Sequence, residues 1–187
     1  MISENSVGEI VNGLSRVSDD VNASFAKLSA EQLNWKPSPE SWSVGQCLDH
    51  LITTNRSYHQ GFDEVINGSR VTRFMERLPV LPGLFGNLLV KSLDPDASRK
   101  LKAPGAFQAS SSAIPVTIIS DFMSQQDETI RRMKACESMQ TEKIIITSPA
   151  LSLITYSLMD AFKILLTHER RHVKQAKNVT QTPGFPI

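Results

Sequence analysis

Two of the four histidines in this 187-residue chain stand four residues apart near its C-terminus, in the stretch THERRHVKQA (167–176). Residues at positions i and i+4 of a helix project from the same side, so His168 and His172 could bind one metal ion together. The letters HERRH also match the HExxH signature of zinc proteases, in which Glu169 would be the general base. That signature normally has a third ligand downstream, and no His, Asp or Glu follows His172. A metal site and a charged helix end are therefore the two readings that remain.

The two histidines continue the apolar stripe of a predicted helix rather than its polar face. A buried imidazole without a partner is costly, and one divalent metal would satisfy both rings. A catalytic zinc usually has three protein ligands and an open position, so a third ligand is needed. His50 lies at the edge of the apolar stripe of another predicted helix and is available for that role. The fourth histidine, His59, lies on the outer face of the same helix, where we expect it to be solvated.

Five further side chains near these positions have both a functional and a structural interpretation. Cys47, one turn before His50, could be a fourth ligand or a nucleophile, but an isolated cysteine on an apolar stripe is usually a small buried hydrophobe. Asn55 and Tyr58 could line a cavity, and a buried tyrosine commonly packs with its hydroxyl satisfied. Gln175 could hydrogen-bond to a ligand or substrate, or lie at the solvent-exposed end of a bundle. Glu169 could act as a base or orient a ligand, or be solvated.

Periodic apolar patterns predict the elements that must position these residues. Four segments with a period of 3.6 residues begin near Ser6, at Ser43, after Pro115 and near Ser157. The first is expected to end near Leu28. Ser43 and the glutamine three residues later form a capping box, and Gly68 is a plausible end for that helix. The sequence therefore predicts an all-α protein, a four-helix bundle with long connections, in a single domain over residues 1–187.

The connections carry predictions of their own. Residues 29–42 contain two prolines and are expected to break the helical pattern, with Trp35 and Trp42 fastening this loop to the bundle. Residues 141–156 are β-branched and predict an extended crossover. Residues 70–115 predict a long irregular insertion, which could cover the metal, form a homodimer contact or simply pack. Its apolar residues include Leu81, Leu84, Phe85 and Leu88.

Composition excludes several classes of function. Hydrophobic residues make up 40% of the chain, charged residues 21%, and the formal net charge is +1, so neither nucleic acid nor an anionic membrane is expected as a partner. No basic and apolar leader and no apolar run of spanning length is present in the sequence. Two cysteines do not make a disulfide framework. We expect a reduced, cytoplasmic protein.

Two stretches resemble those of a known family. LNWKPSPESWSVGQCLDHL (33–51) and SLMDAFKILLTHERRHVKQA (157–176) are similar to the second and last helices of the DinB-like (damage-inducible, YfiT-like) family of metalloenzymes. The resemblance implies a four-helix bundle that holds one divalent metal, commonly nickel or zinc, on three histidines. Carried over position by position, the ligands would be His50, His168 and His172.

The resemblance also implies a class of activity. We expect a metal-dependent enzyme acting on a small-molecule substrate, of the hydrolase type or of the S-transferase type that uses a low-molecular-weight thiol. The alternative is a non-catalytic binding module, in which a structural metal or none is bound and the bundle holds an apolar ligand or a partner protein.

Overall fold

The computed structural model describes residues 4–77 and 113–187 of the chain. The elements in chain order are α1 (Val7–Phe25), α2 (Ala30–Asn34), α3 (Val44–Ile66), the 3₁₀-helix η1 (Phe74–Arg77), α5 (Ile118–Ala135), β1 (Ile145–Thr147), β2 (Thr155–Ser157) and α6 (Leu158–Thr180). The predicted all-α class is confirmed, because the two short strands make up a minor part of the described residues. No helix in these residues is long and apolar enough to cross a membrane.

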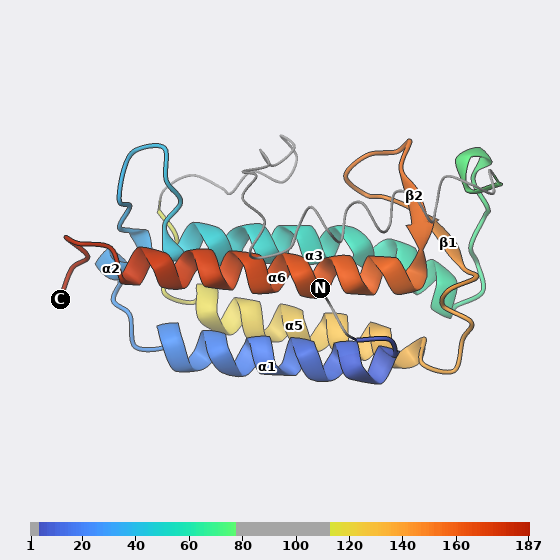
Figure 1. Cartoon of the computed structure of the whole chain (residues 1–187), viewed down its shortest axis with the longest axis horizontal. Helices are drawn as coiled ribbons and strands as arrows, with labels where there is room; N and C mark the ends of the chain where they lie inside the picture. The colour runs from blue at the N-terminus through green and yellow to red at the C-terminus, as the bar shows by residue number, and fades with distance from the viewer. Residues whose placement is uncertain (1–3, 78–112) are drawn as a thin grey trace.

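Four long helices form two layers, α3 beside α6 and α1 beside α5 (Figure 1). Each helix packs against two others, in the ring α1–α5–α3–α6, around a core of aliphatic and aromatic side chains. Figure 1 shows α3 and α5 running in the same direction, whereas α6 runs antiparallel to α3. Helices α3 and α5 are therefore parallel neighbours, and two parallel helices in contact need a longer connection than an antiparallel pair. The expected roles of the predicted insertion fall on residues 78–112, outside the described part of the chain.

Serine caps set the start of most of the helices. The Ser43 hydroxyl accepts a hydrogen bond from the backbone N–H of Gln46, whose side chain accepts one from the backbone N–H of Ser43 in return, so the predicted capping box is confirmed. Ser157 caps α6 in a similar way by accepting from the N–H of Asp160. At the other end of α3, Gly68 has a positive φ of 65°, a conformation that favours glycine and ends a helix.

Several predicted boundaries were wrong. Helix α1 ends at Phe25 rather than Leu28, and residues 29–42 contain the short helix α2 because Ser29 begins a second capping box ahead of the prolines. The predicted start of the third long helix after Pro115 is correct, since α5 begins at Ile118. The predicted extended segment is an antiparallel hairpin in which Ile146 is paired with Tyr156. A crossover pattern of β-branched residues does not reveal a hairpin unless the turn has a recognisable signature.

The short helix α2 and the residues just before α5 close the end of the bundle where α3 begins. The Asn34 side chain makes two hydrogen bonds of 2.8 Å with the backbone of Ile114. Ile114 in turn packs against Gly45 in the first turn of α3, where an added Cβ atom would lie 2.9 Å from the isoleucine side chain. This close contact needs glycine and fixes the start of α3, the helix that carries His50.

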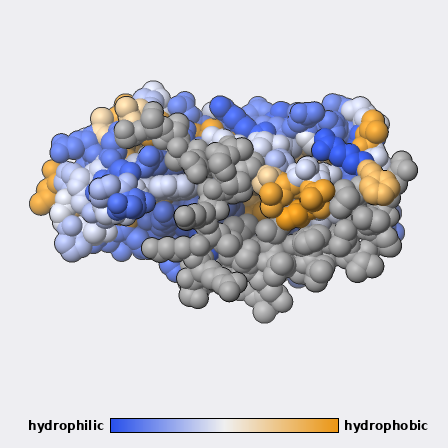
Figure 2. Space-filling model, turned by 90° about the horizontal axis from the view of Figure 1, so that it is seen from above, coloured by the Kyte–Doolittle hydropathy of each residue, from blue (hydrophilic) through white to orange (hydrophobic). Residues whose placement is uncertain are grey.

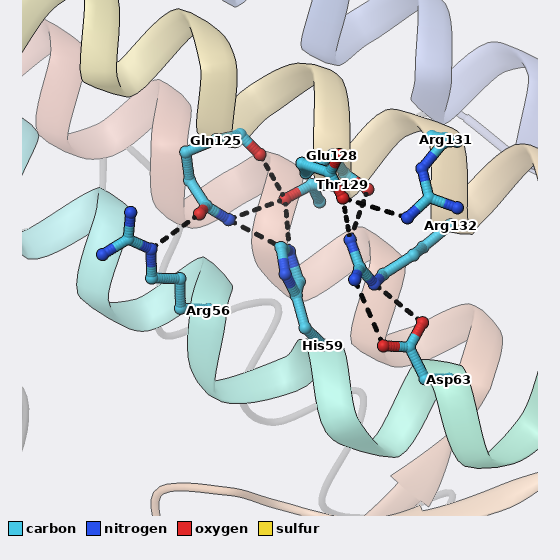
Figure 3. A network of polar contacts seen from close by, with 8 residues as sticks. All are labelled: Arg56, His59, Asp63, Gln125, Glu128, Thr129, Arg131 and Arg132. Carbon is cyan, nitrogen blue, oxygen red and sulfur yellow. Dashed lines mark hydrogen bonds and ion pairs between the residues drawn. The ribbon is translucent and has the colours of Figure 1, made fainter.

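The prediction of a solvated His59 was wrong. Its Nε2 atom lies 3.0 Å from the side-chain nitrogen of Gln125 and 3.0 Å from the Thr129 hydroxyl, across the α3–α5 interface (Figure 3). The Gln125 carbonyl accepts from Arg56, so its amide nitrogen faces His59 and donates to it. Burial, and next the charge of Arg132, lower the pKa of His59 to about 4, against the opposite effect of the nearby acidic residues Asp63 and Glu128.

This contact predicts a pH dependence of stability. Because the pKa of His59 is lowered from 6.5 to about 4 on folding, the unfolded chain binds this proton first. The free energy of unfolding should therefore fall as the pH drops through that window, and His59→Gln should reduce the slope, as measured by urea unfolding at several pH values. The other histidines are unchanged between the two proteins and cancel in the comparison. Equal slopes in both proteins would contradict the buried, neutral state of His59.

Candidate metal centre

Three histidines meet between α3 and α6, near the end of the bundle where α3 begins. His50 lies in the second turn of α3, and His168 and His172 lie one turn apart near the middle of α6. The ring centroids are 4.8 Å apart for His50 and His168 and 4.6 Å apart for each of the other two pairs. One ligand nitrogen from each ring lies within 4.8 Å of the other two. The structure thus brings together residues separated by more than a hundred positions in the sequence.

The geometry of the donor atoms fits a divalent metal. The Nε2 atoms of His50 and His168 are 3.0 Å apart. Two imidazole nitrogens at ~2.1 Å from one ion lie roughly 3.0 to 3.4 Å apart, for right-angled or tetrahedral coordination. The Nδ1 atom of His168 has no hydrogen-bond partner among the described residues, so its polar contacts depend on Nε2. The three rings therefore place one nitrogen each where they could hold a metal ion together.

Burial keeps two of the rings neutral. His50 and His168 are buried and His172 is partly buried. Loss of solvation, followed by repulsion from the neighbouring imidazoles, holds the pKa of His168 well below its ordinary value. Burial and then the proximity of His50 lower the pKa of His172 to about 3. Neutral imidazole is the form that binds a metal, so the site offers its lone pairs at neutral pH without first losing protons.

Two further side chains orient these ligands. Gln175 accepts a hydrogen bond of 3.0 Å from Nδ1 of His172, which directs the Nε2 atom of that ring away from the glutamine. Trp42 stacks on His172 with ring centroids 5.5 Å apart and a 21° angle between the planes, and lies 4.9 Å from the His50 ring. The sequence suggested Trp42 only as a fastening for the loop. Its position just before the Ser43 cap is the signal that places it beside the first turns of α3.

Three of the other candidates lie away from the ligand atoms. Cys47 is fully buried, burial raises the pKa of its thiol to about 12, and it is not part of the metal-ligand group found among the described residues. The Tyr58 hydroxyl is 2.8 Å from the Tyr156 hydroxyl, deep in the bundle, so the structural interpretation holds for that residue. Asn55 is buried and donates to Glu169 over 2.8 Å.

Glu169 is neither solvated nor one of the metal-ligand residues. Its side chain is fully buried and points into the bundle, where its two oxygens accept from Asn55 on α3 and from Gln126 on α5. Burial raises the pKa of Glu169 to about 7, and the two hydrogen bonds oppose that rise. The sequence reading did not single out Gln126 as a partner of Glu169. The available signal was that Gln126 is a polar residue on the otherwise apolar stripe of its helix, which indicates a buried hydrogen bond.

The hydrogen bond from His172 predicts a role for Gln175 in metal affinity. Gln175→Ala removes the acceptor that orients the ring, and loss of such a partner weakens metal binding by roughly 10- to 100-fold. Isothermal titration of the protein with nickel(II) measures the change. Gln60→Ala, at an exposed position of α3, is the matched control and should bind like wild type. Unchanged affinity in Gln175→Ala would mean that His172 is held by its packing alone.

The position of Cys47 predicts that it is inert. Cys47→Ala should retain the nickel content of wild type, because the thiol is fully buried and lies outside the ligand group. Since the thiolate is the reactive form, the folded protein should also resist alkylation by iodoacetamide at neutral pH until it is denatured. Mass spectrometry and metal analysis read out the two results. A loss of nickel in Cys47→Ala would make Cys47 a ligand after all.

Comparison with known proteins agrees with the geometry. Searches of curated proteins and of solved structures found no match for the chain. The sequence profile of the DinB superfamily matches residues 14–176, which include α3, most of α6 and all three histidines of the cluster. The resemblance noted in the sequence is confirmed by this match, and the chain belongs to the DinB superfamily.

Proposed function

We propose that this protein is a metal-dependent enzyme that acts on a small molecule at the site formed by His50, His168 and His172. The observation that supports the proposal is the convergence of three imidazole nitrogens within 4.8 Å, on two helices that pack against each other. Three histidines are the ligand set that catalytic metal sites use when a further position is left for water or substrate. Nickel and zinc are the ions that we propose for it.

The chain's own residues prepare this site in three ways. His168 and His172 are held neutral by burial, so each presents a lone pair. Gln175 orients the His172 ring through its Nδ1 proton. Trp42 covers the rings of His50 and His172 and limits the access of water from its side. When bound, a divalent metal would supply Lewis acidity, which polarises a substrate and lowers the pKa of a water or thiol that reaches it.

Two reaction types are compatible with this chemistry. One is hydrolysis, and the other is transfer to or from sulfur with a low-molecular-weight thiol as co-substrate. The pKa of Cys47 argues against a protein thiol as the nucleophile, because a group with a pKa of about 12 is protonated at neutral pH. A thiol-dependent reaction at this site would therefore take its sulfur from a small molecule.

Metal analysis of histidine variants tests the ligand set. We expect wild type loaded with nickel(II) or zinc(II) to hold one ion per chain, and His50→Ala, His168→Ala and His172→Ala to lose most of it. His59→Gln is the matched control, because it removes the fourth histidine, which is also half-buried on α3 but hydrogen-bonded to α5. Wild type that retains no metal, or His59→Gln that loses as much as the other three variants, would refute the site.

Spectroscopy of the cobalt(II)-substituted protein separates an enzyme from a binding module. Addition of a small thiol such as cysteine or glutathione should change the cobalt spectrum if an exchangeable position exists, and the loaded protein should then be screened with thioesters and electrophiles. A cobalt spectrum that no thiol, carboxylate or azide alters would indicate a closed structural site, and with it a non-catalytic module.

A further inference from the structure

A second group of polar side chains lies in the interior of the bundle and joins all four long helices. Glu169 on α6 accepts at 2.8 Å from Asn55 on α3 and at 2.5 Å from Gln126 on α5. The Gln126 amide nitrogen also lies 3.3 Å from the carbonyl oxygen of Leu14 on α1. Glu169, Asn55 and Gln126 each have no exposed surface. We call these three residues the polar layer.

The polar layer ties together the two helices that carry the metal ligands. Glu169 directly follows His168 on α6, and Asn55 lies little more than one turn beyond His50 on α3. The hydrogen bond between Glu169 and Asn55 therefore spans the same helix pair as the contact between the His168 and His50 rings. Rotation of α6, or its sliding along α3, would break both.

Apolar packing alone does not specify such an alignment. Hydrophobic side chains tolerate small rotations and shifts, and buried polar groups are often no more stabilising than apolar groups of the same volume. A buried hydrogen-bonded group instead strongly disfavours every arrangement in which its partners are missing. Buried polar residues in helical assemblies are known to select one register in this way.

We propose that the polar layer is a positioning device, which sets the rotation and register of α6 against α3 so that His168 and His172 meet His50. The inference rests on the proposed metal site and gives Glu169 a role different from the general base that HExxH would suggest. Glu169 and its partners act through the histidines, by holding the helices that carry them, and touch neither metal nor substrate.

A conservative variant separates hydrogen bonding from carboxylate chemistry. In Glu169→Gln the new carbonyl oxygen can still accept from Gln126, and the new amide can donate to Asn55 if that side chain reverses. Reversal gives up the long 3.4 Å hydrogen bond from the Asn55 amide nitrogen to the Gln126 carbonyl oxygen, but no bond of Oδ1, which has no hydrogen-bond partner among the described residues. We expect Glu169→Gln to bind nickel(II) with an affinity close to that of wild type.

An apolar variant removes the layer while retaining its volume. Replacement of all three residues, as Asn55→Leu, Gln126→Met and Glu169→Met together, leaves no unpaired side chain, so the protein should stay folded. Its nickel affinity should fall by roughly 10- to 100-fold, the range typical of residues that orient metal ligands. Gln125→Met is the matched control, because Gln125 is a buried amide of the same helix that contacts Arg56 and His59 instead.

Nickel titration calorimetry and urea unfolding of each variant decide the question. Weak nickel binding by a folded apolar variant, with near wild-type binding by Glu169→Gln and Gln125→Met, supports the positioning role. Wild-type affinity in the apolar variant overturns it, and so does a Glu169→Gln protein that binds as weakly as the apolar one. If the triple variant does not fold, Asn55→Ala replaces it, with the same expected direction and the same overturning result. Wild type that binds no nickel refutes the proposed function itself, a separate outcome.

Discussion

An imidazole buried inside a helical bundle has lost its contact with water and must find another partner. Two buried rings and a third, partly buried one meet between α3 and α6, where the Nε2 atoms of His50 and His168 are only 3.0 Å apart. Charged imidazoles could not approach so closely, and burial accordingly keeps His168 and His172 neutral. Much of the surrounding structure can be understood from this requirement, because helices that carry converging lone pairs have to be held in one relative position.

The supports of the two helices that carry the cluster lie at the start of each helix. The first turn of α3 is fixed by the Ser43 capping box and by the close contact of Gly45 with Ile114. Trp42, which directly precedes that cap, lies against two of the histidine rings. Helix α6 begins at the end of strand β2 and is capped by Ser157. The serine caps and the Gly45 contact therefore set the residue at which each helix starts. That residue in turn decides in which direction each later side chain of the helix points.

The polar layer and the contacts of His59 both join α3 to α5, but they differ in which group is the hydrogen-bond acceptor and in how deeply they are buried. In the polar layer, amide donors converge on the Glu169 carboxyl group, whose oxygens accept. Around His59 an amide donor points at a ring nitrogen that must be neutral to accept it. The first arrangement is deep and links four helices, whereas the second is partly exposed and surrounded by ion pairs such as that of Arg132 with Asp63 (Figure 3). Figure 2 shows that apolar residues also lie on the surface of the molecule. The exposed large apolar side chains of the described residues include Phe74 of η1 and Leu153 of the turn between β1 and β2.

The sequence by itself determined the helical class, the starts of α3 and α6, and the placement of His168 and His172 on one side of a helix, because period, capping boxes and the spacing of these two histidines are local properties. It could not decide the environment of single side chains. His59 was expected in solvent and Glu169 had three possible roles, yet both are held by residues of α5 that are distant in the chain. The edge position of His50 became an inward one only once α6 packed against α3. Tertiary structure decided these points, since burial and hydrogen-bond partners depend on which helix lies opposite, and that information is absent from any one helix.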